Sequence, residues 1–301
     1  MTAATRFDIV HTTTYSYRSP VTFGEHRVMF RPRDSHDQRV LATDLKVSME
    51  SIVRLIQDPH SNSVALVQPL GQATELKLVC SFSIEQAPGE TQALSISPSG
   101  EYLPVSYSLQ DRIDLEHYLR PHHDDPKGEL AAWASLFMSP VGRTRTRDLL
   151  EHMNRHIGAT LKYIPRDEEG TQSPTQTLTL GSGSCRDYAL LMMEAARRMG
   201  IATRFVSGYL YDAALDATHT HITDGKAIAG AGYTHAWLEA YLPGAGWAAF
   251  DPTNNIVGGS QLIRVGVARD PAFAAPVSGS WYGAADAYLG LIATVQVTRQ
   301  G

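Results

Sequence analysis

Residues 181–200 read GSGSCRDYALLMMEAARRMG, and this stretch governs how the rest of the chain is interpreted. Two glycines and two serines open onto a run in which apolar side chains recur at helical spacing. Most of the charged side chains fall elsewhere on the helical wheel. We predict a helix that begins at Cys185, with Ser182 or Ser184 as its N-cap, and that ends at Gly200.

Cys185 therefore lies in the first turn of the predicted helix. The N-terminal amides of a helix have no partners within it and carry partial positive charge, so they favour the thiolate form of a nearby cysteine. Thiolate is the nucleophilic form. The alternative is that Cys185 is a small buried residue, as free cysteines often are. The local sequence leaves both interpretations open.

The second cysteine, Cys80, shows what a structural cysteine looks like in this chain. Residues 76–84 read LKLVCSFSI, in which apolar and polar side chains largely alternate. That period is typical of a half-buried strand and places Cys80 among its inward side chains. We predict that Cys80 is structural.

Residues 233–253, YTHAWLEAYLPGAGWAAFDPT, contain two apolar, aromatic-rich runs on either side of the turn PGAG, which indicates a β-hairpin. His235 and Asp251 lie at the same end of this hairpin. Tight pairing would leave them about three residues, or ~10 Å, out of register, so we expect a bulge or a different register to bring them together. Taken singly, each residue also has an ordinary structural explanation.

Three motifs together resemble the transglutaminase-like superfamily, specifically bacterial members with an extra N-terminal region: GSGSCRDYA, THAW and FDPTN. The segment MGIATRFVSGYLY, the opening FDIVHTTTYSYRSPV and the C-terminal tail also look like regions of these proteins. The resemblance implies that Cys185, His235 and Asp251 are the family's triad. The chain departs from many relatives at Arg186, where they carry Gln, and at Leu190, where His is common.

The residue types support an acyl-transfer mechanism. Cys185 would attack an amide carbonyl, His235 would carry the proton to the departing amine, and Asp251 would orient the imidazole. Water acting on the resulting thioester gives a peptidase or amidase, whereas an amine gives a transamidase. We favour hydrolysis, because water needs no second binding site. A transamidase, or a binding module without turnover, is the alternative.

An oxyanion hole is also needed, and the backbone amide of Cys185 is one donor. Tyr163, in LKYIP, resembles in position an aromatic residue that precedes the nucleophile in relatives, so its hydroxyl is a candidate second donor. An ordinary tyrosine of the core or its rim is the alternative. Ser184 and Trp237 are further candidates for oxyanion or substrate contacts.

Two histidine-containing segments raise the alternative of a metal site. Neither has the HExxH spacing or the paired cysteines of strong zinc assignments, so we expect no metal and no cofactor. The residues concerned are His219, His221 and Asp224, with His235 as a further ligand, and the group His122, His123, Asp124 and Asp125. Residues 212–232 are rich in Ala, Gly, Thr and Asp, and we predict a loop there, next to the active site.

Composition fits an enzyme rather than a nucleic-acid binder. The chain has 301 residues, 43% of them hydrophobic, and a net charge of −5. No apolar run approaches the ~20 residues of a membrane span, and the first residues do not resemble a signal peptide. We therefore expect a cytoplasmic enzyme that acts on a peptide or protein, with no nucleic-acid or membrane partner.

Two domains are expected. Short alternating runs predict a β-sandwich-like domain over residues 1–120, followed by a polar linker at 120–128. Helices are predicted at residues 130–138 and 148–157, and from Ser173 with a capping box. With the hairpin, they predict an α+β catalytic domain over residues 129–301, including a strand-rich C-terminal tail. The resemblance implies a papain-like architecture for this domain.

Overall fold

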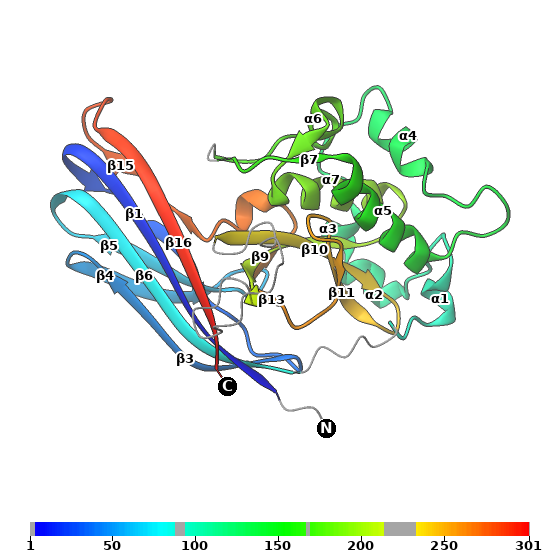
Figure 1. Ribbon diagram of the computed structural model, residues 1–301, viewed down its shortest axis with the longest axis horizontal. Coiled ribbons are helices and arrows are strands. Elements are labelled where there is room, and N and C mark those ends of the chain that lie inside the picture. Colours follow the sequence, from blue (N-terminus) through cyan, green and yellow to red (C-terminus); the bar gives the residue numbers. More distant parts are fainter. Residues whose placement is uncertain (1–3, 88–93, 167–168, 214–232, 301) are drawn as a thin grey trace.

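The structure, a computed structural model, describes residues 4–87, 94–166, 169–213 and 233–300. Figure 1 shows an N-terminal β-rich part that packs beside a mixed core of helices and strands. The strands of the N-terminal part are β1 (Thr5–Phe23), β2 (His26–Arg31), β3 (Gln38–Val47), β4 (Ser51–Gln57), β5 (Ser63–Pro69) and β6 (Gln72–Gln86).

The N-terminal part is a β-sandwich. One sheet has the order β15-β1-β6-β3 with β16 also paired to β1, and the other has the order β14-β2-β5-β4, in which β14 (Val277–Ser278), β15 (Trp281–Tyr282) and β16 (Tyr288–Gln300) lie near the C-terminus. Along β6, Leu76, Leu78 and Cys80 are all buried and alternate with more exposed side chains. Cys80 packs with Val28 and Val67 of the opposite sheet. The prediction that Cys80 is an inward side chain of a strand is confirmed.

The C-terminal strands β14, β15 and β16 complete the sandwich. β16 pairs antiparallel along β1, from Arg6 opposite Gln300 to Tyr17 opposite Tyr288. The sequence assigns this tail to the catalytic domain, but its hydrogen bonds go to β1 and β2, because strand pairing over such a distance leaves no local signal in the sequence.

The described helices are α1 (Pro98–Glu101), α2 (Leu109–Asp114), α3 (Glu116–Leu119), α4 (Glu129–Ser135), α5 (Thr146–Thr160), α6 (Pro174–Leu180) and α7 (Cys185–Arg198). The helices expected after residue 129 are confirmed as α4, α5 and α6, and α6 begins with the predicted capping box of Ser173 and Gln176. The three short helices before residue 120 replace expected sandwich strands, because helices this short carry no clear period. Of the described helices, none is long and apolar enough to cross a membrane.

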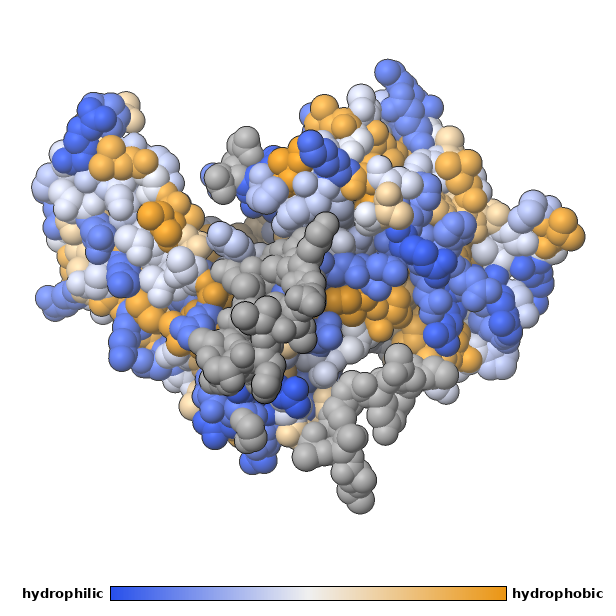
Figure 2. Space-filling view, viewed as in Figure 1, coloured by the Kyte–Doolittle hydropathy of each residue, from blue (hydrophilic) through white to orange (hydrophobic). Residues whose placement is uncertain are grey.

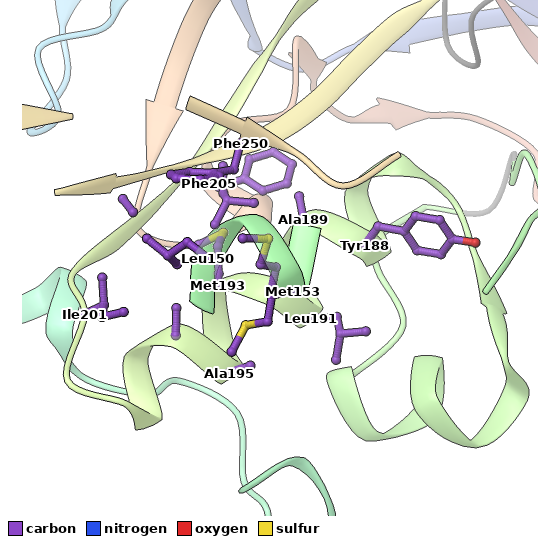
Figure 3. Close-up of a cluster of buried hydrophobic side chains, with 14 of the residues drawn as sticks. Leu150, Met153, Tyr188, Ala189, Leu191, Met193, Ala195, Ile201, Phe205 and Phe250 are labelled. Atoms are coloured by element: carbon purple, nitrogen blue, oxygen red, sulfur yellow. The ribbon is translucent and has the colours of Figure 1, made fainter. Parts of the chain in front are cut away.

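The core is built on a five-stranded antiparallel sheet of order β12-β11-β10-β9-β13. Its strands are β9 (Thr203–Leu210), β10 (Thr234–Leu242), β11 (Gly246–Asp251), β12 (Ile256–Val257) and β13 (Leu262–Ala268). Figure 3 shows Leu150 and Met153 of α5 packing with α7 side chains and with Phe205 and Phe250 of the sheet. Burial of these side chains holds α7 against the strands that carry His235 and Asp251.

Charged side chains of α7 are buried as well. Asp187 and Glu194 have no exposed surface, and Arg197 is only 2% exposed. Glu194 pairs with Arg197 at 2.8 Å and accepts backbone N–H groups of the predicted linker, including that of His122. The expected polar face of this helix is therefore enclosed, since each buried charge has a partner of opposite sign.

The sandwich and the core share a hydrophobic cluster. Phe7 and Ile9 of β1 pack with Tyr209 of β9 and Ile263 of β13. The hydroxyl of Tyr209 also lies 2.9 Å from Nδ1 of His11, within the same interface. Burial on both sides fixes the sandwich against the edge of the core sheet.

Candidate active site

Cys185 is the first residue of α7. Ser184, in an extended conformation, precedes it as the N-cap, so of the two serines considered the structure uses this one. Gly181 ends α6 with a φ of +60°, which lets the chain turn into β8 (Ser182–Gly183) and then α7. The backbone amide of Cys185 thus belongs to the first-turn amides that no helical carbonyl satisfies.

Asp187 organises the start of this helix. Its Oδ2 accepts the backbone N–H and the hydroxyl of Ser184, both at 2.8 Å. Its Oδ1 accepts the backbone N–H of Gln172 at 2.7 Å, and both oxygens accept from the guanidinium of Arg166 at 2.8 and 2.9 Å. The carboxylate therefore ties the segment before α6 to the helix that presents the thiol.

These contacts define what two residues at the start of α7 do. The hydroxyl of Ser184 is donated to Asp187, so this serine serves the helix start rather than a substrate contact. Asp187 was not singled out from the sequence. The spacing Ser-x-x-Asp before an apolar run is the capping-box signal that would have identified it.

His235 and Asp251 form a buried pair. Nε2 of His235 lies 2.8 Å from Oδ2 of Asp251, and neither side chain is exposed. The pairing of β10 with β11 is regular from Leu238 opposite Phe250 to Leu242 opposite Gly246.

Continuing this register places Asp251 opposite Trp237, with His235 two residues farther along on the same face. Diagonal neighbours on a sheet are ~7–8 Å apart, which two side chains readily bridge. The expectation that a bulge or a shifted register is needed is therefore wrong.

Asp251 is held as a carboxylate. Its Oδ1 accepts the backbone N–H of Thr253, and its Oδ2 accepts the side-chain amide of Asn254, both at 2.9 Å. Burial favours the neutral acid, but the His235 charge and these hydrogen bonds outweigh it and lower the pKa of Asp251 below its ordinary value.

The imidazole of His235 lies between this carboxylate and the thiol. Burial lowers the pKa of His235, but the charge and hydrogen bond of Asp251, and then the neighbouring Cys185, outweigh burial and raise the pKa to about 10. The buried Nδ1 of His235 has no hydrogen-bond partner among the described residues. Because Nε2 faces Asp251, Nδ1 is the nitrogen left for the thiol, and catalytic hydrogen bonds are often long before substrate binds.

Trp237 lies under the imidazole. Its ring stacks on that of His235, with 6.0 Å between centroids and 29° between planes. Trp237 is only 1% exposed and packs with Val206 and Val267. This position supports the histidine ring, whereas the sequence placed Trp237 among the candidates for oxyanion or substrate contacts.

Tyr163 lies beside the thiol. It belongs to β7 (Lys162–Tyr163), which pairs parallel to β8 and places Tyr163 opposite Gly183. Burial is the main cause that raises the pKa of Tyr163, followed by the neighbouring Cys185. The structure thus brings this hydroxyl to the cysteine, in line with its candidacy as a donor.

The candidate metal ligands divide into two groups. His219, His221 and Asp224 lie outside the described residues, as does most of the predicted loop at 212–232. In the other group, Nε2 of His122 lies 3.0 Å from the carbonyl oxygen of His117, and the carboxylate of Asp125 accepts the backbone N–H of Ala131 at 2.9 Å. Within the described ranges, no cluster of three or more His, Cys, Asp or Glu side chains is placed to hold a metal.

Comparison with known proteins covers most of the chain. A family model described as the transglutaminase-like superfamily matches residues 140–252, a range that includes Cys185, His235 and Asp251. A second model, described as the bacterial transglutaminase-like N-terminal region, matches residues 7–85. The first match contains α5 to β11 of the core, and the second contains nearly all of β1 to β6 of the sandwich.

Individual relatives extend along the full length. An uncharacterized protein of Mycobacterium leprae is 28% identical over 98% of this chain and 99% of its own length. An uncharacterized protein of Mycobacterium tuberculosis is 25% identical over 92% of this chain and 88% of its own. The crystal structure of a proposed cysteine protease from Cytophaga hutchinsonii superposes with a TM-score of 0.70 at 20% identity, covering 99% of this chain and 91% of that one. At that identity the similarity establishes the fold.

Proposed function

Because the chain belongs to the transglutaminase-like superfamily, a family of thiol-dependent enzymes, we propose that it is an amide-bond hydrolase with Cys185 as the nucleophile. The observation that carries the proposal is the buried His235–Asp251 pair, whose imidazole is close enough to Cys185 for the thiol to raise its pKa. A raised histidine pKa favours a thiolate–imidazolium pair over two neutral groups.

The first half of the reaction is acylation. The Cys185 sulfur attacks the amide carbon, and the carbonyl oxygen becomes an oxyanion that the Cys185 amide and the Tyr163 hydroxyl stabilise. His235 then gives its proton to the nitrogen of the departing amine, so that the C–N bond breaks and a thioester remains. Asp251 keeps Nε2 occupied, which holds Nδ1 toward the sulfur, and Trp237 limits tilting of the ring.

The second half is deacylation. Water loses a proton to His235 and attacks the thioester, which releases a carboxylate and restores the thiol. An amine in place of water would give a new amide, so the same acyl-enzyme also serves a transamidase. We assign hydrolysis because it requires no second substrate site.

The direct test uses quenched fluorescent peptides with the wild-type protein, Cys185→Ala and, as a matched control, Cys80→Ala. We expect cleavage by the wild type and by Cys80→Ala, and none by Cys185→Ala. Turnover that survives in Cys185→Ala would reject the mechanism. Parallel reactions with a biotinylated amine distinguish the outcomes, since incorporation that exceeds cleavage would identify a transamidase.

A further inference from the structure

One face of the larger sandwich sheet packs against the core at one end and is exposed to solvent at the other. Residues directly opposite on β1 and β16 share a face. The pairs on this face are His11↔Val295, Thr13↔Ala293, Tyr15↔Leu291 and Tyr17↔Tyr288. Val295, next to the core, is 9% exposed, whereas Leu291 and Tyr288 are each 45% exposed. The same apolar face is thus buried at one end and open at the other.

The open end is aromatic. The Tyr17 ring centroid lies 5.3 Å from that of Trp281 and 5.8 Å from that of Tyr288, and the rings of Trp281 and Tyr288 stack at 6.3 Å. We call Tyr15, Tyr17, Trp281, Tyr288 and Leu291 the aromatic wall. Tyr17 is only 4% exposed and supports its neighbours, while Tyr288 and Leu291 offer exposed apolar contact area.

The aromatic wall borders a hollow in the surface. β16 begins at Tyr288, which places the open end of this face at the upper end of the sandwich in Figure 1. Figure 2 shows the molecule hollowed between that end of the sandwich and the helical side of the core. The hollow therefore has the sandwich on one side and the part of the core around α7 on the other.

One contact and one electrostatic effect relate the aromatic wall's face to the active site. Tyr209, which meets His11 in the interface, pairs with Thr234, the residue before His235. The pKa of Tyr15 is raised to about 12, first by burial, then by its tyrosine neighbours and by the charge of Glu169, which places that carboxylate near the wall.

The position of Glu169 in the chain limits how far this residue lies from the active site. Glu169 follows Tyr163, the residue beside Cys185, by six positions in the chain. Six residues span at most ~20 Å, which is an upper limit on the distance between Tyr163, beside the thiol, and Glu169, near the wall.

We propose that this hollow binds an extended stretch of a polypeptide substrate, and that the aromatic wall receives an apolar or aromatic side chain within about six residues of the reacting amide. The inference rests on the proposed function and adds a substrate class to it: unfolded or flexible polypeptide rather than a small amide. The sandwich then acts as a specificity domain, since the wall lies on it while the reacting groups lie on the core.

Adjacent residues of β16 provide a matched pair of variants. Leu291 is 45% exposed on the face of the aromatic wall, and Ile292 is 68% exposed on the opposite face of the same strand. Leu291→Asp places a charge in the hollow, while Ile292→Asp places the same charge on the other side of the sheet. Tyr288→Ala is a second variant of the wall, and thermal unfolding checks that all three proteins fold.

Two substrates separate this inference from the proposed function. Acetylation by p-nitrophenyl acetate, located by mass spectrometry, reports whether Cys185 reacts with a molecule too small to reach the wall. A quenched, randomised dodecapeptide library reports what an extended substrate requires. If the ester fails to acylate Cys185 in the wild type, it is the proposed function that fails.

We expect the wild type to cleave peptides enriched in aromatic or aliphatic residues at one position within about six residues of the cut. Leu291→Asp and Tyr288→Ala should lose this enrichment and raise KM for a selected peptide about tenfold, with ester acylation unchanged. Ile292→Asp should behave as the wild type. The inference is overturned by a library cut without such enrichment, by equal effects of Leu291→Asp and Ile292→Asp, or by an acylated enzyme that cuts no peptide.

Discussion

The two cysteines of this chain lie in opposite surroundings, although both are reduced and neither is fully exposed. Cys80 is in the middle of β6 among apolar side chains, and burial raises the pKa of its thiol to about 12. Cys185 begins α7, with unsatisfied amides behind it and His235 beside it. Burial thus accounts for an unreactive thiol at Cys80, whereas the helix start and the histidine account for the proposed nucleophile at Cys185.

The largest expected effect comes from removing the charge that holds the histidine. Asp251→Asn keeps the shape of the side chain but loses the carboxylate that fixes the His235 ring, so kcat should fall by about 10³- to 10⁴-fold. The measurement is steady-state cleavage of a peptide selected with the wild type. An unchanged kcat would mean that Cys185 does not depend on a histidine oriented by Asp251.

A smaller loss is expected from the Tyr163 hydroxyl. Tyr163→Phe removes one oxyanion donor beside Cys185 and should lower kcat about 10²-fold with little change in KM. Tyr188→Phe is the matched control, because the buried hydroxyl of Tyr188 has no hydrogen-bond partner among the described residues. Equal activity of the two variants would remove Tyr163 from the mechanism.

The same comparison predicts a cost in stability at the other cysteine. Cys80→Ser places a hydroxyl in the apolar space between the two sheets, which should lower the free energy of unfolding by about 1–3 kcal/mol. Peptide cleavage by the folded variant should match the wild type. Urea denaturation measures the first quantity, and a loss of activity in folded Cys80→Ser would contradict the division between the two thiols.

The smallest effect is a pH dependence of stability. Burial lowers the pKa of His235, but Asp251 and Cys185 raise it from its ordinary value of 6.5 to about 10. The stabilisation from protonated His235 is therefore fully present below pH 6.5 and is lost as the pH rises through 10. The excess in Tm of the wild type over Asp251→Asn should shrink from pH 6 to pH 10, and a constant excess would argue against the ion pair.

Local signals in the sequence were sufficient for the elements that carry the site. The start of α7 at Cys185, the capping box of α6 at Ser173 and the hairpin turn before Gly246 each depend on residues that are neighbours in the chain. Such signals fix where elements begin and end. The resemblance of the three motifs to one family then predicted that the helix with Cys185 lies beside the hairpin with His235 and Asp251.

Features that depend on distant partners could not be predicted. The diagonal approach of His235 to Asp251 follows from a register that the hairpin sequence does not specify. Asp187 and Glu194 were expected on a polar face, but the Arg166 guanidinium and the His122 backbone N–H that contact them come from segments far from α7 in the chain. The pairing of β16 with β1 joins the two ends of the chain, and alternating side chains show only that a strand exists.

The central claim is that His235 makes Cys185, and not Cys80, a nucleophile. Its most direct test is the rate of iodoacetamide labelling at pH 7, followed by peptide mass mapping in the wild type and in His235→Ala. We predict that Cys185 reacts at least about 10²-fold faster than Cys80 in the wild type, and that His235→Ala removes most of this difference. Equal, slow labelling of both cysteines, or a Cys185 rate that His235→Ala leaves unchanged, would contradict the account.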